Sequence, residues 1–248
     1  MNWLFLRGLV REQRHWADFP ERFRAVHPQA RIFMLDFPGI GTEIERPSPW
    51  DLEGIMRDLR NRWRRLRESQ PGPWALLSIS LGSMAGVRWA EEFPADFERI
   101  VLINTSASGL STPWRRLAPT GLADLGRTIL RRSPVDKEMA ILDMVSNLRQ
   151  DRRELAEAWA AIAPSPAKRA DIFARQVAAA LRFSCSAPLA VPVLVLNSAK
   201  DRMVDASCSR VIAERLGAPL ITHPEAGHDL PLDDGTWVAE RVRDWLKA

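Results

Sequence analysis

Several features that would assign this sequence to a specialised class of protein are missing from it. The 248 residues include only two cysteines, Cys185 and Cys208, so there is neither a disulfide framework nor the ligand spacing of a zinc site. No apolar run is long enough to span a bilayer, and Arg7 interrupts the apolar start of the chain, which argues against a signal peptide. We therefore expect a protein of the reducing cytoplasm.

Motifs for cofactors and nucleic acids are missing as well. There is no P-loop, no Gly-x-Gly-x-x-Gly after a strand and no cluster of Cys and His, so the sequence predicts neither a cofactor nor a metal. No nucleic-acid-binding module is recognisable, although the net charge is +4. Repeats and Gly/Ser linkers are also absent. With 46% hydrophobic residues the chain has enough apolar material for one domain, and nothing in it specifies an oligomeric state.

What the sequence does contain is an alternation of strand and helix patterns. Short runs rich in apolar and β-branched residues predict strands, among them Asn2–Leu6, Ile100–Thr105 and Val191–Asn197. Serine followed by proline predicts several helix starts, at Ser48-Pro49, Ser133-Pro134 and Ser165-Pro166. Such an alternation is typical of a parallel sheet with helices on both faces.

The most informative junction of a strand with a helix is centred on Ser80. The apolar run 74–79 predicts a buried strand, and the small residues after Ser80 predict the start of a helix. A sharp turn between them needs small neighbours on both sides, and Ser78 and Gly82 meet that need. The turn would hold the Ser80 hydroxyl above the sheet edge and direct the amide of Leu81 toward a developing oxyanion. The alternative is a plain helix N-cap.

This junction resembles the nucleophile elbow of the α/β-hydrolase superfamily, in particular its serine esterase and lipase branch, whose motif is Gly-x-Ser-x-Gly. Ser78 stands where that motif has its first glycine. The resemblance implies an α/β-hydrolase fold, a mostly parallel sheet flanked by helices with an inserted helical lid. It covers residues 1–106 and 189–248 as the core, and it leaves residues 107–188 as the lid.

The resemblance also implies an acid and then a histidine after the serine. Asp201 follows a predicted strand, and His228 follows Gly227 in the loop after the next strand. A serine hydroxyl is a weak nucleophile until an imidazole accepts its proton, and the imidazole needs a carboxylate to fix its tautomer. The resemblance therefore assigns catalytic roles to Ser80, Asp201 and His228.

Other titratable residues compete for these roles. Asp205 is a rival acid, although it also suits the start of a helix. His15 is a rival histidine because it lies near the loop that follows the first strand. His223 lies inside a predicted strand and is expected to be packed there, and His27 is expected at the surface.

The loop after the first strand matches the place where the family carries its second oxyanion donor. The resemblance takes that donor from the residue after a glycine, which here makes Leu9 the partner of Leu81 in an oxyanion hole. Gly8 allows the close approach of the backbone. Arg7 stands where the family often has histidine, so the hydrogen bonds that hold this loop are left open.

The lid of the resemblance would shape the acyl pocket and exclude water. Its predicted substrate contacts, with Gly8 of the core, are Trp114, Leu122 and Leu125. Further candidates for the inner wall are Leu117, Ile129 and Met144. The alternative is that these residues pack the lid against itself.

The resemblance implies a carboxylesterase acting on a small acyl ester, and the charge distribution adds an alternative. Residues 110–185 contain thirteen Lys or Arg and eight Asp or Glu. A basic lid would attract an acidic acyl carrier or a coenzyme A ester, as in a thioesterase or a carrier-linked ester hydrolase. A solvated lid surface explains the same charge. An alternative of another class is a non-catalytic ligand-binding protein on the same fold, because Arg7 and Ser78 depart from the family pattern.

Overall fold

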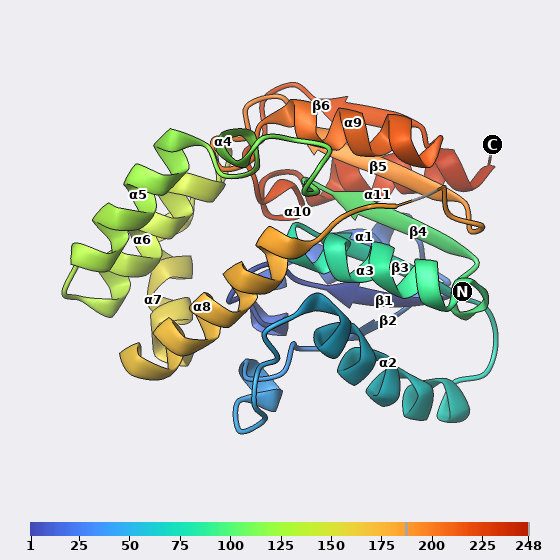
Figure 1. Cartoon of the computed structure of the whole chain (residues 1–248), viewed down its shortest axis with the longest axis horizontal. Coiled ribbons are helices and arrows are strands. Elements are labelled where there is room, and N and C mark those ends of the chain that lie inside the picture. The colour runs from blue at the N-terminus through green and yellow to red at the C-terminus, as the bar shows by residue number, and fades with distance from the viewer. Residues whose placement is uncertain (187, 248) are drawn as a thin grey trace.

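Within the described residues, six parallel strands form one sheet at the centre of the molecule (Figure 1). The computed structural model describes residues 1–186 and 188–247, except the side chains at positions 122, 125–127, 129, 130 and 166. Every strand pairing is parallel, in the order β2-β1-β3-β4-β5-β6. The bounds are β1 Asn2–Leu6, β2 Arg31–Met34, β3 Trp74–Ile79, β4 Arg99–Ile103, β5 Val193–Ser198 and β6 Leu220–His223.

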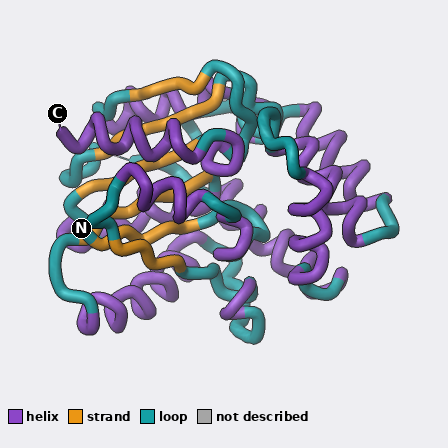
Figure 2. The backbone as a smooth tube through the Cα atoms, turned by 180° about the vertical axis from the view of Figure 1, so that it is seen from behind, coloured by secondary structure: helices purple, strands orange, loops and turns teal. Residues whose placement is uncertain are grey.

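Helices cover both faces of this sheet, as Figures 1 and 2 show from opposite sides. On one face lie α2 Leu52–Ser69, α3 Leu81–Glu92 and α9 Ala206–Leu216, and on the other lie α1 Phe19–Val26 and α11 Gly235–Lys247. The shorter elements are α10 Leu230–Asp233, η1 Gln13–Trp16, η2 Gly41–Glu43 and η3 Pro94–Asp96. The predicted fold class is therefore confirmed.

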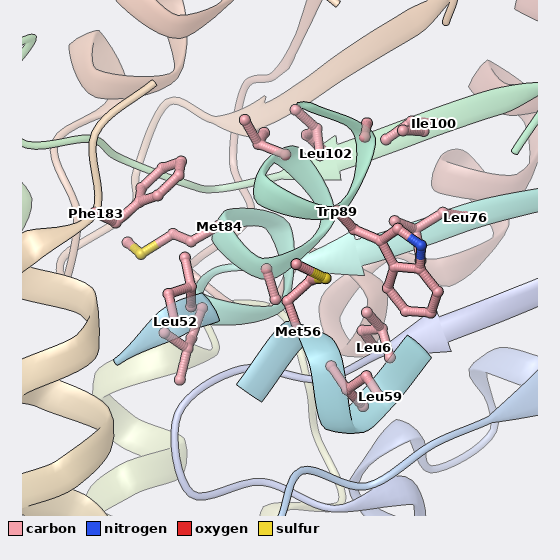
Figure 3. Close-up of a cluster of buried hydrophobic side chains, with 14 of the residues drawn as sticks. Leu6, Leu52, Met56, Leu59, Leu76, Met84, Trp89, Ile100, Leu102 and Phe183 are labelled. Carbon is pink, nitrogen blue, oxygen red and sulfur yellow. The ribbon is translucent and has the colours of Figure 1, made fainter. Parts of the chain in front are cut away.

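The strands are apolar on both faces because both faces carry helices. Successive side chains of a strand point to opposite faces. In β1, Leu4 and Leu6 belong to the core beneath α2, α3 and α9, whereas Trp3 and Phe5 belong to the core beneath α1 and α11. Figure 3 shows the first of these cores, with Leu6 facing α2 and α3.

The path of the chain changes direction in the sheet between β1 and β3. From β1 the chain runs to β2 on one side, returns to β3 on the other side of β1, and then continues outward through β4, β5 and β6. The connections after β1 and β3 therefore leave in opposite directions, and this opens a crevice at the carboxyl ends of these two strands. Gly8, after β1, and Ser80, after β3, meet at that crevice.

The described part of the stretch between β4 and β5 contains five helices, and we call this stretch the helical insert (residues 107–188). They are α4 Pro113–Arg116, α5 Pro119–Leu130, α6 Pro134–Val145, α7 Arg152–Ile162 and α8 Pro166–Arg182. In Figure 1, α5, α6, α7 and α8 lie beyond the carboxyl ends of the strands, and α6 packs against both α5 and α7. The insert therefore stands beside the crevice between β1 and β3.

The structure can be compared with the expectations about membrane spans and cysteines. Among the described residues, no helix has both the length and the apolar character that crossing a membrane requires. Cys185 and Cys208 are buried and free. Burial raises the pKa of the Cys185 thiol to about 11, with a smaller contribution from Glu91, so this thiol is protonated at neutral pH.

The aromatic centre of the first core gives a test of packing. Trp63 is fully buried and contacts Trp74 and Trp89 edge to face. We expect Trp63→Ala to lower the free energy of unfolding by about 3–5 kcal/mol, because it removes apolar contacts and leaves a cavity. Trp114 is 64% exposed, so Trp114→Ala is the matched control and should change stability by about 0.5 kcal/mol or less. Urea denaturation measures both, and equal losses would contradict this description of the core.

Candidate active site

Ser80 occupies the turn between β3 and α3 in a strained backbone conformation. Its φ of 56° and ψ of −119° lie in a region that residues other than glycine rarely adopt. The neighbouring strand β4 and the loop after it hold this conformation. The Ser80 N–H donates to the carbonyl of Ile103 at 2.8 Å, and the hydroxyl of Thr105 donates to the carbonyl of Ser80 at 3.1 Å.

Different constraints act on the two small residues that flank Ser80, Gly82 and Ser78. A Cβ at Gly82 would lie 2.5 Å from the carbonyl oxygen of Arg7 and 2.6 Å from that of Leu6, so only glycine allows α3 to begin this close to the end of β1. Ser78 is fully buried, and its hydroxyl donates to the carbonyl of Val101 at 3.2 Å. That hydrogen bond accommodates serine where the family motif has glycine.

The structure brings Asp201 and His228 into direct contact. His228 Nδ1 lies 2.7 Å from Asp201 Oδ2, and both side chains are buried. The other carboxylate oxygen, Oδ1, accepts the backbone N–H groups of Met203 and Val204 at 2.8 and 2.9 Å. These hydrogen bonds fix the carboxylate in the loop after β5, so that one oxygen is directed to the imidazole.

The surroundings of His228 change its basicity. Burial lowers the pKa of the imidazole, but the charge and the hydrogen bond of Asp201 outweigh burial. Asp229 adds to the increase and Arg7 opposes it, and the pKa of His228 is raised above its ordinary value of 6.5. The ring is therefore a stronger base than a free histidine.

The rival residues have other roles or lie elsewhere. Asp205 is the N-cap of α9 and accepts the N–H of Ser207 at 2.8 Å. His15 is buried, and its pKa is well below its ordinary value because of burial and the positive charges nearby. His223 accepts two amides of the loop that follows it. His27, expected at the surface, is half-buried, and its Nε2 lies 2.9 Å from a backbone carbonyl oxygen of α11.

The loop after β1 lies directly against the turn at Ser80. A Cβ at Gly8 would lie 3.2 Å from the Cβ of Ser80 and 3.6 Å from its hydroxyl oxygen. Among the described residues, the backbone amides of Leu9 and Leu81 donate no hydrogen bond. Leu9 follows Gly8, which lies against Ser80, and Leu81 follows Ser80 itself, so each amide is one residue from this contact.

The same loop is held from the helical insert. Val10 has a φ of 53°, an uncommon conformation for a β-branched residue, and its N–H donates to Gln176 Oε1 at 2.8 Å. Gln176 belongs to α8 and is fully buried. The conformation of the loop therefore depends on a contact with the insert, which sequence analysis did not predict.

A buried ion pair joins the loop after β1 to the residue after His228. Arg7 donates two hydrogen bonds to Asp229, from Nη1 at 3.1 Å and from Nη2 at 2.5 Å, and both side chains are 6% exposed. The guanidinium also lies over the ring of Trp16, 4.7 Å from its centroid. This pair supplies the hydrogen bonds that the sequence left open at Arg7. In the sequence, the only sign of this pair is the acid Asp229 directly after His228.

Asn104 is a further residue that sequence analysis did not single out. It follows β4 with a φ of 45°. Its side-chain amide donates to the carbonyl of His228 at 2.7 Å and to the hydroxyl of Ser198 at 3.1 Å, and its Oδ1 accepts the N–H of Ser198 at 2.9 Å. Asn104 thereby ties the histidine loop to the ends of β4 and β5. The feature that could have indicated this role is the position of Asn104, a polar residue directly after an apolar strand.

A cavity of about 420 Å³ opens between these loops and the helical insert. This volume lies within the usual range for small-molecule sites, about 300–1,000 Å³. Ser80, His228, Gly8 and Leu9 line it from the core. Helices α6 and α8 line it from the insert, with apolar side chains that include Ile141, Met144, Val145, Phe173 and Val177.

Some of the residues predicted to contact substrate line this cavity, and others do not. Leu117 and Met144 line the cavity, as does Gly8. Trp114 is not among the lining residues, and its side chain is 64% exposed on α4, so the substrate contact predicted for it is wrong. The side chains of Leu122 and Leu125, and that of Ile129, lie outside the described residues. No group of three or more His, Cys, Asp or Glu in the described part of the chain could hold a metal ion.

Comparisons with known proteins identify the family. A family model described as alpha/beta hydrolase family matches residues 3–241. No curated protein matches the chain significantly.

Solved structures with the same fold include proteins of different activities. A membrane phospholipase A, described as a bacterial virulence factor, has a TM-score of 0.79 at 19% identity, with 99% of this chain and 78% of that chain covered. A meta-cleavage product hydrolase from Pseudomonas fluorescens has a TM-score of 0.77 at 14% identity, with coverages of 100% and 90%. A thermophilic esterase from Thermogutta terrifontis has a TM-score of 0.71 at 18% identity, with coverages of 100% and 89%. At these identities the likeness establishes the fold.

The ion pair between Arg7 and Asp229 can be tested by removing one charge. Asp229→Asn leaves the guanidinium buried without its counter-ion, and we expect the free energy of unfolding to fall by about 3–5 kcal/mol. The double variant Arg7→Met with Asp229→Leu should regain most of that loss, because no unpaired charge is left. The control is Glu225→Gln, which breaks an exposed ion pair with Lys200 and should cost about 1 kcal/mol or less. Equal effects of Asp229→Asn and Glu225→Gln in urea denaturation would contradict the prediction.

Proposed function

The chain belongs to the alpha/beta hydrolase family, and we propose that it hydrolyses carboxylic esters through an acyl-enzyme on Ser80. The observation that carries this proposal is the strained turn that presents Ser80 to a cavity shared with His228, whose other side is hydrogen-bonded to Asp201. Strain of this kind persists only where the surrounding structure holds it, and it is concentrated at functional sites.

In the proposed reaction, Ser80 Oγ attacks the ester carbonyl while His228 accepts the hydroxyl proton. His228 then gives this proton to the leaving alcohol as the bond between carbon and oxygen breaks. A water molecule next attacks the acyl-enzyme, with His228 again as the base, and releases the acid and Ser80. Asp201 keeps the imidazole in the tautomer that accepts a proton at Nε2 and stabilises its charged form.

The oxyanion that forms in each step needs donors, and we assign them to the amides of Leu9 and Leu81. This assignment is supported by the position of the two residues beside Ser80 and by their lack of another acceptor among the described residues. Losing one such donor typically lowers kcat by about 10²–10³. Arg7 and Asn104 act as positioning residues, because they hold the donor loop and the histidine loop through other groups.

The helical insert takes the role of a lid in this proposal. Its helices α6 and α8 supply apolar walls to the cavity, so they would cover the acyl group and exclude water from the reacting atoms. The cavity is of ordinary ligand size, which favours short and medium acyl chains over long ones.

An acyl thioester is the second candidate substrate, and it would use the same residues in the same roles. The exposed arginines of the insert, Arg115, Arg131 and Arg132, favour an acidic carrier or coenzyme A. Arg116, in contrast, donates to the carbonyls of Ala180 and Leu181 and therefore serves the structure of the insert. Faster turnover of acyl-CoA than of simple esters, lost at high salt, would favour this candidate. A binding role without catalysis predicts no turnover of either.

The nucleophile is tested with p-nitrophenyl esters from acetyl to palmitoyl. We expect hydrolysis with a maximum at short or medium chain length, and a loss of at least about 10³-fold in Ser80→Ala. The control Ser78→Gly restores the family motif and keeps the nucleophile, so it should keep most of the activity. Labelling by a fluorophosphonate should occur in the wild type and in Ser78→Gly but not in Ser80→Ala. Full activity of Ser80→Ala would overturn the proposal.

The acid is tested through the pH dependence of kcat/KM. His228 must be neutral to act as base, and because its pKa is raised, wild-type activity should rise with pH through a value above 6.5. Asp201→Asn removes the charge that raises this pKa, so burial lowers it and the rise should move to lower pH. The rate should also fall by about 10⁴-fold because the tautomer is no longer fixed. Asp205→Asn is the matched control, and a shift in that variant instead would reassign the acid.

A further inference from the structure

The charged residues that line the cavity are strongly unbalanced. Arg7, Arg11, Lys137 and Arg169 face a single acid, Asp229. Because Arg7 and Asp229 neutralise one another in their buried ion pair, three cationic side chains are left at a wall that is otherwise mainly apolar. These three come from the loop after β1, from α6 and from α8.

One buried carboxylate lies among these cations and is shared by two of them. Glu138 is 1% exposed, and its two oxygens accept from Arg11 Nη1 at 2.8 Å and from Arg169 Nη2 at 2.7 Å. Burial raises the pKa of Glu138, but the charges of Arg11 and Arg169 outweigh burial and lower it, so the carboxylate is ionised. Two guanidinium groups with one carboxylate retain one positive charge.

Two further donors of this group, Arg11 Nη2 and Lys137 Nζ, have no partner among the described residues. The Arg11 side chain is 10% exposed, and its Nη2 is buried without a hydrogen-bond partner among the described residues. The guanidinium lies over the ring of Trp159, 5.0 Å from its centroid. Lys137 is half-buried and has no ion-pair partner within the described part of the chain. A buried donor without a partner is unfavourable by about 1–3 kcal/mol, and an anionic ligand would remove that penalty.

These positive charges also lower the pKa of a neighbouring histidine, His15. The pKa of His15 is lowered first by burial and then by the positive charges of Arg11, Arg7 and Arg169. His15 is therefore neutral and adds no charge of its own. Glu12, an acid of the same loop, is paired with Arg14 and does not line the cavity.

We propose that Arg11, Lys137 and Arg169 form an anion subsite, and that the natural substrate is an ester carrying a second, ionised carboxylate or phosphate group. This inference rests on the proposed ester hydrolysis at Ser80. The same cavity wall includes Ile141, Phe173 and Val177, whose apolar side chains would accommodate an apolar spacer between the ester and the anion. Guanidinium groups recognise carboxylate and phosphate by the same pairs of N–H donors, so both anions satisfy the geometry.

The test compares pairs of p-nitrophenyl esters that have equal chain length. One member of each pair ends in a methyl group and the other in a carboxylate, from succinate to suberate; a third series ends in a phosphonate. For at least one length we expect kcat/KM of an anionic ester to exceed that of its neutral partner by about tenfold or more, mainly through KM. The better of the carboxylate and phosphonate series identifies the anion.

Two variants separate the subsite from a merely structural ion pair. Lys137→Met removes a cation that has no ion pair among the described residues, and it should abolish the preference for the anionic ester by raising the KM of that ester. Lys168→Met is the matched control on α8, because Lys168 pairs with Glu45 and does not line the cavity. It should leave the preference unchanged. Equal effects of the two variants would overturn the subsite.

Failure of the subsite and failure of ester hydrolysis give different results. If neutral esters are cleaved by the wild type but not by Ser80→Ala, and no anionic ester is preferred at any length, the subsite is wrong while the hydrolase stands. If no ester is cleaved, calorimetric titration of adipate and of 4-phosphonobutyrate into the protein tests the subsite alone. Binding that is weakened in Lys137→Met but not in Lys168→Met supports it, and no binding at millimolar concentration overturns it.

Discussion

The close contact between the end of β1 and the start of α3 is the constraint on which the site depends. At Gly82 the backbone of α3 lies so near the carbonyls of Leu6 and Arg7 that no side chain fits between them. This contact fixes where α3 begins, directly after the strained turn at Ser80, and the loop at Gly8 lies against that turn. The strand order then locates the contact at the point where the chain reverses direction in the sheet, so a crevice is open on the outer side.

The loops around this contact are held by buried polar groups rather than by apolar packing alone. Arg7 and Asp229 connect the first loop to the histidine loop, and Asn104 connects the histidine loop to β4 and β5. Inside a protein such hydrogen bonds are strong, and an unpaired member is costly, so each pair specifies one arrangement of its loops. Small displacements of either loop are therefore opposed by the loss of a buried partner.

The helical insert supplies polar contacts to the loop after β1 in addition to the apolar wall of the cavity. Gln176 holds the strained Val10 of the first loop, and Glu138 links Arg11 of the same loop to Arg169 of α8. Movement of α8 would therefore alter both the loop after β1 and the charged wall of the cavity. Under the proposed function, these contacts would couple the position of the insert to the geometry around Ser80.

The sequence by itself predicted the sheet and the turn at Ser80, because local sterics and strand burial leave few alternatives to its apolar runs and its spacing of small residues. The pairing of Asp201 with His228 was implied by the family resemblance, and only the tertiary structure brings the two side chains into contact. The partners of Arg7, the role of Asn104 and the sharing of Glu138 depended on tertiary structure. Each joins segments more than 25 residues apart in side-chain contacts that no local pattern encodes. Trp114 was likewise decided by tertiary structure. As an aromatic residue of the insert it was predicted to line the cavity, but the packing of the insert leaves it exposed to solvent.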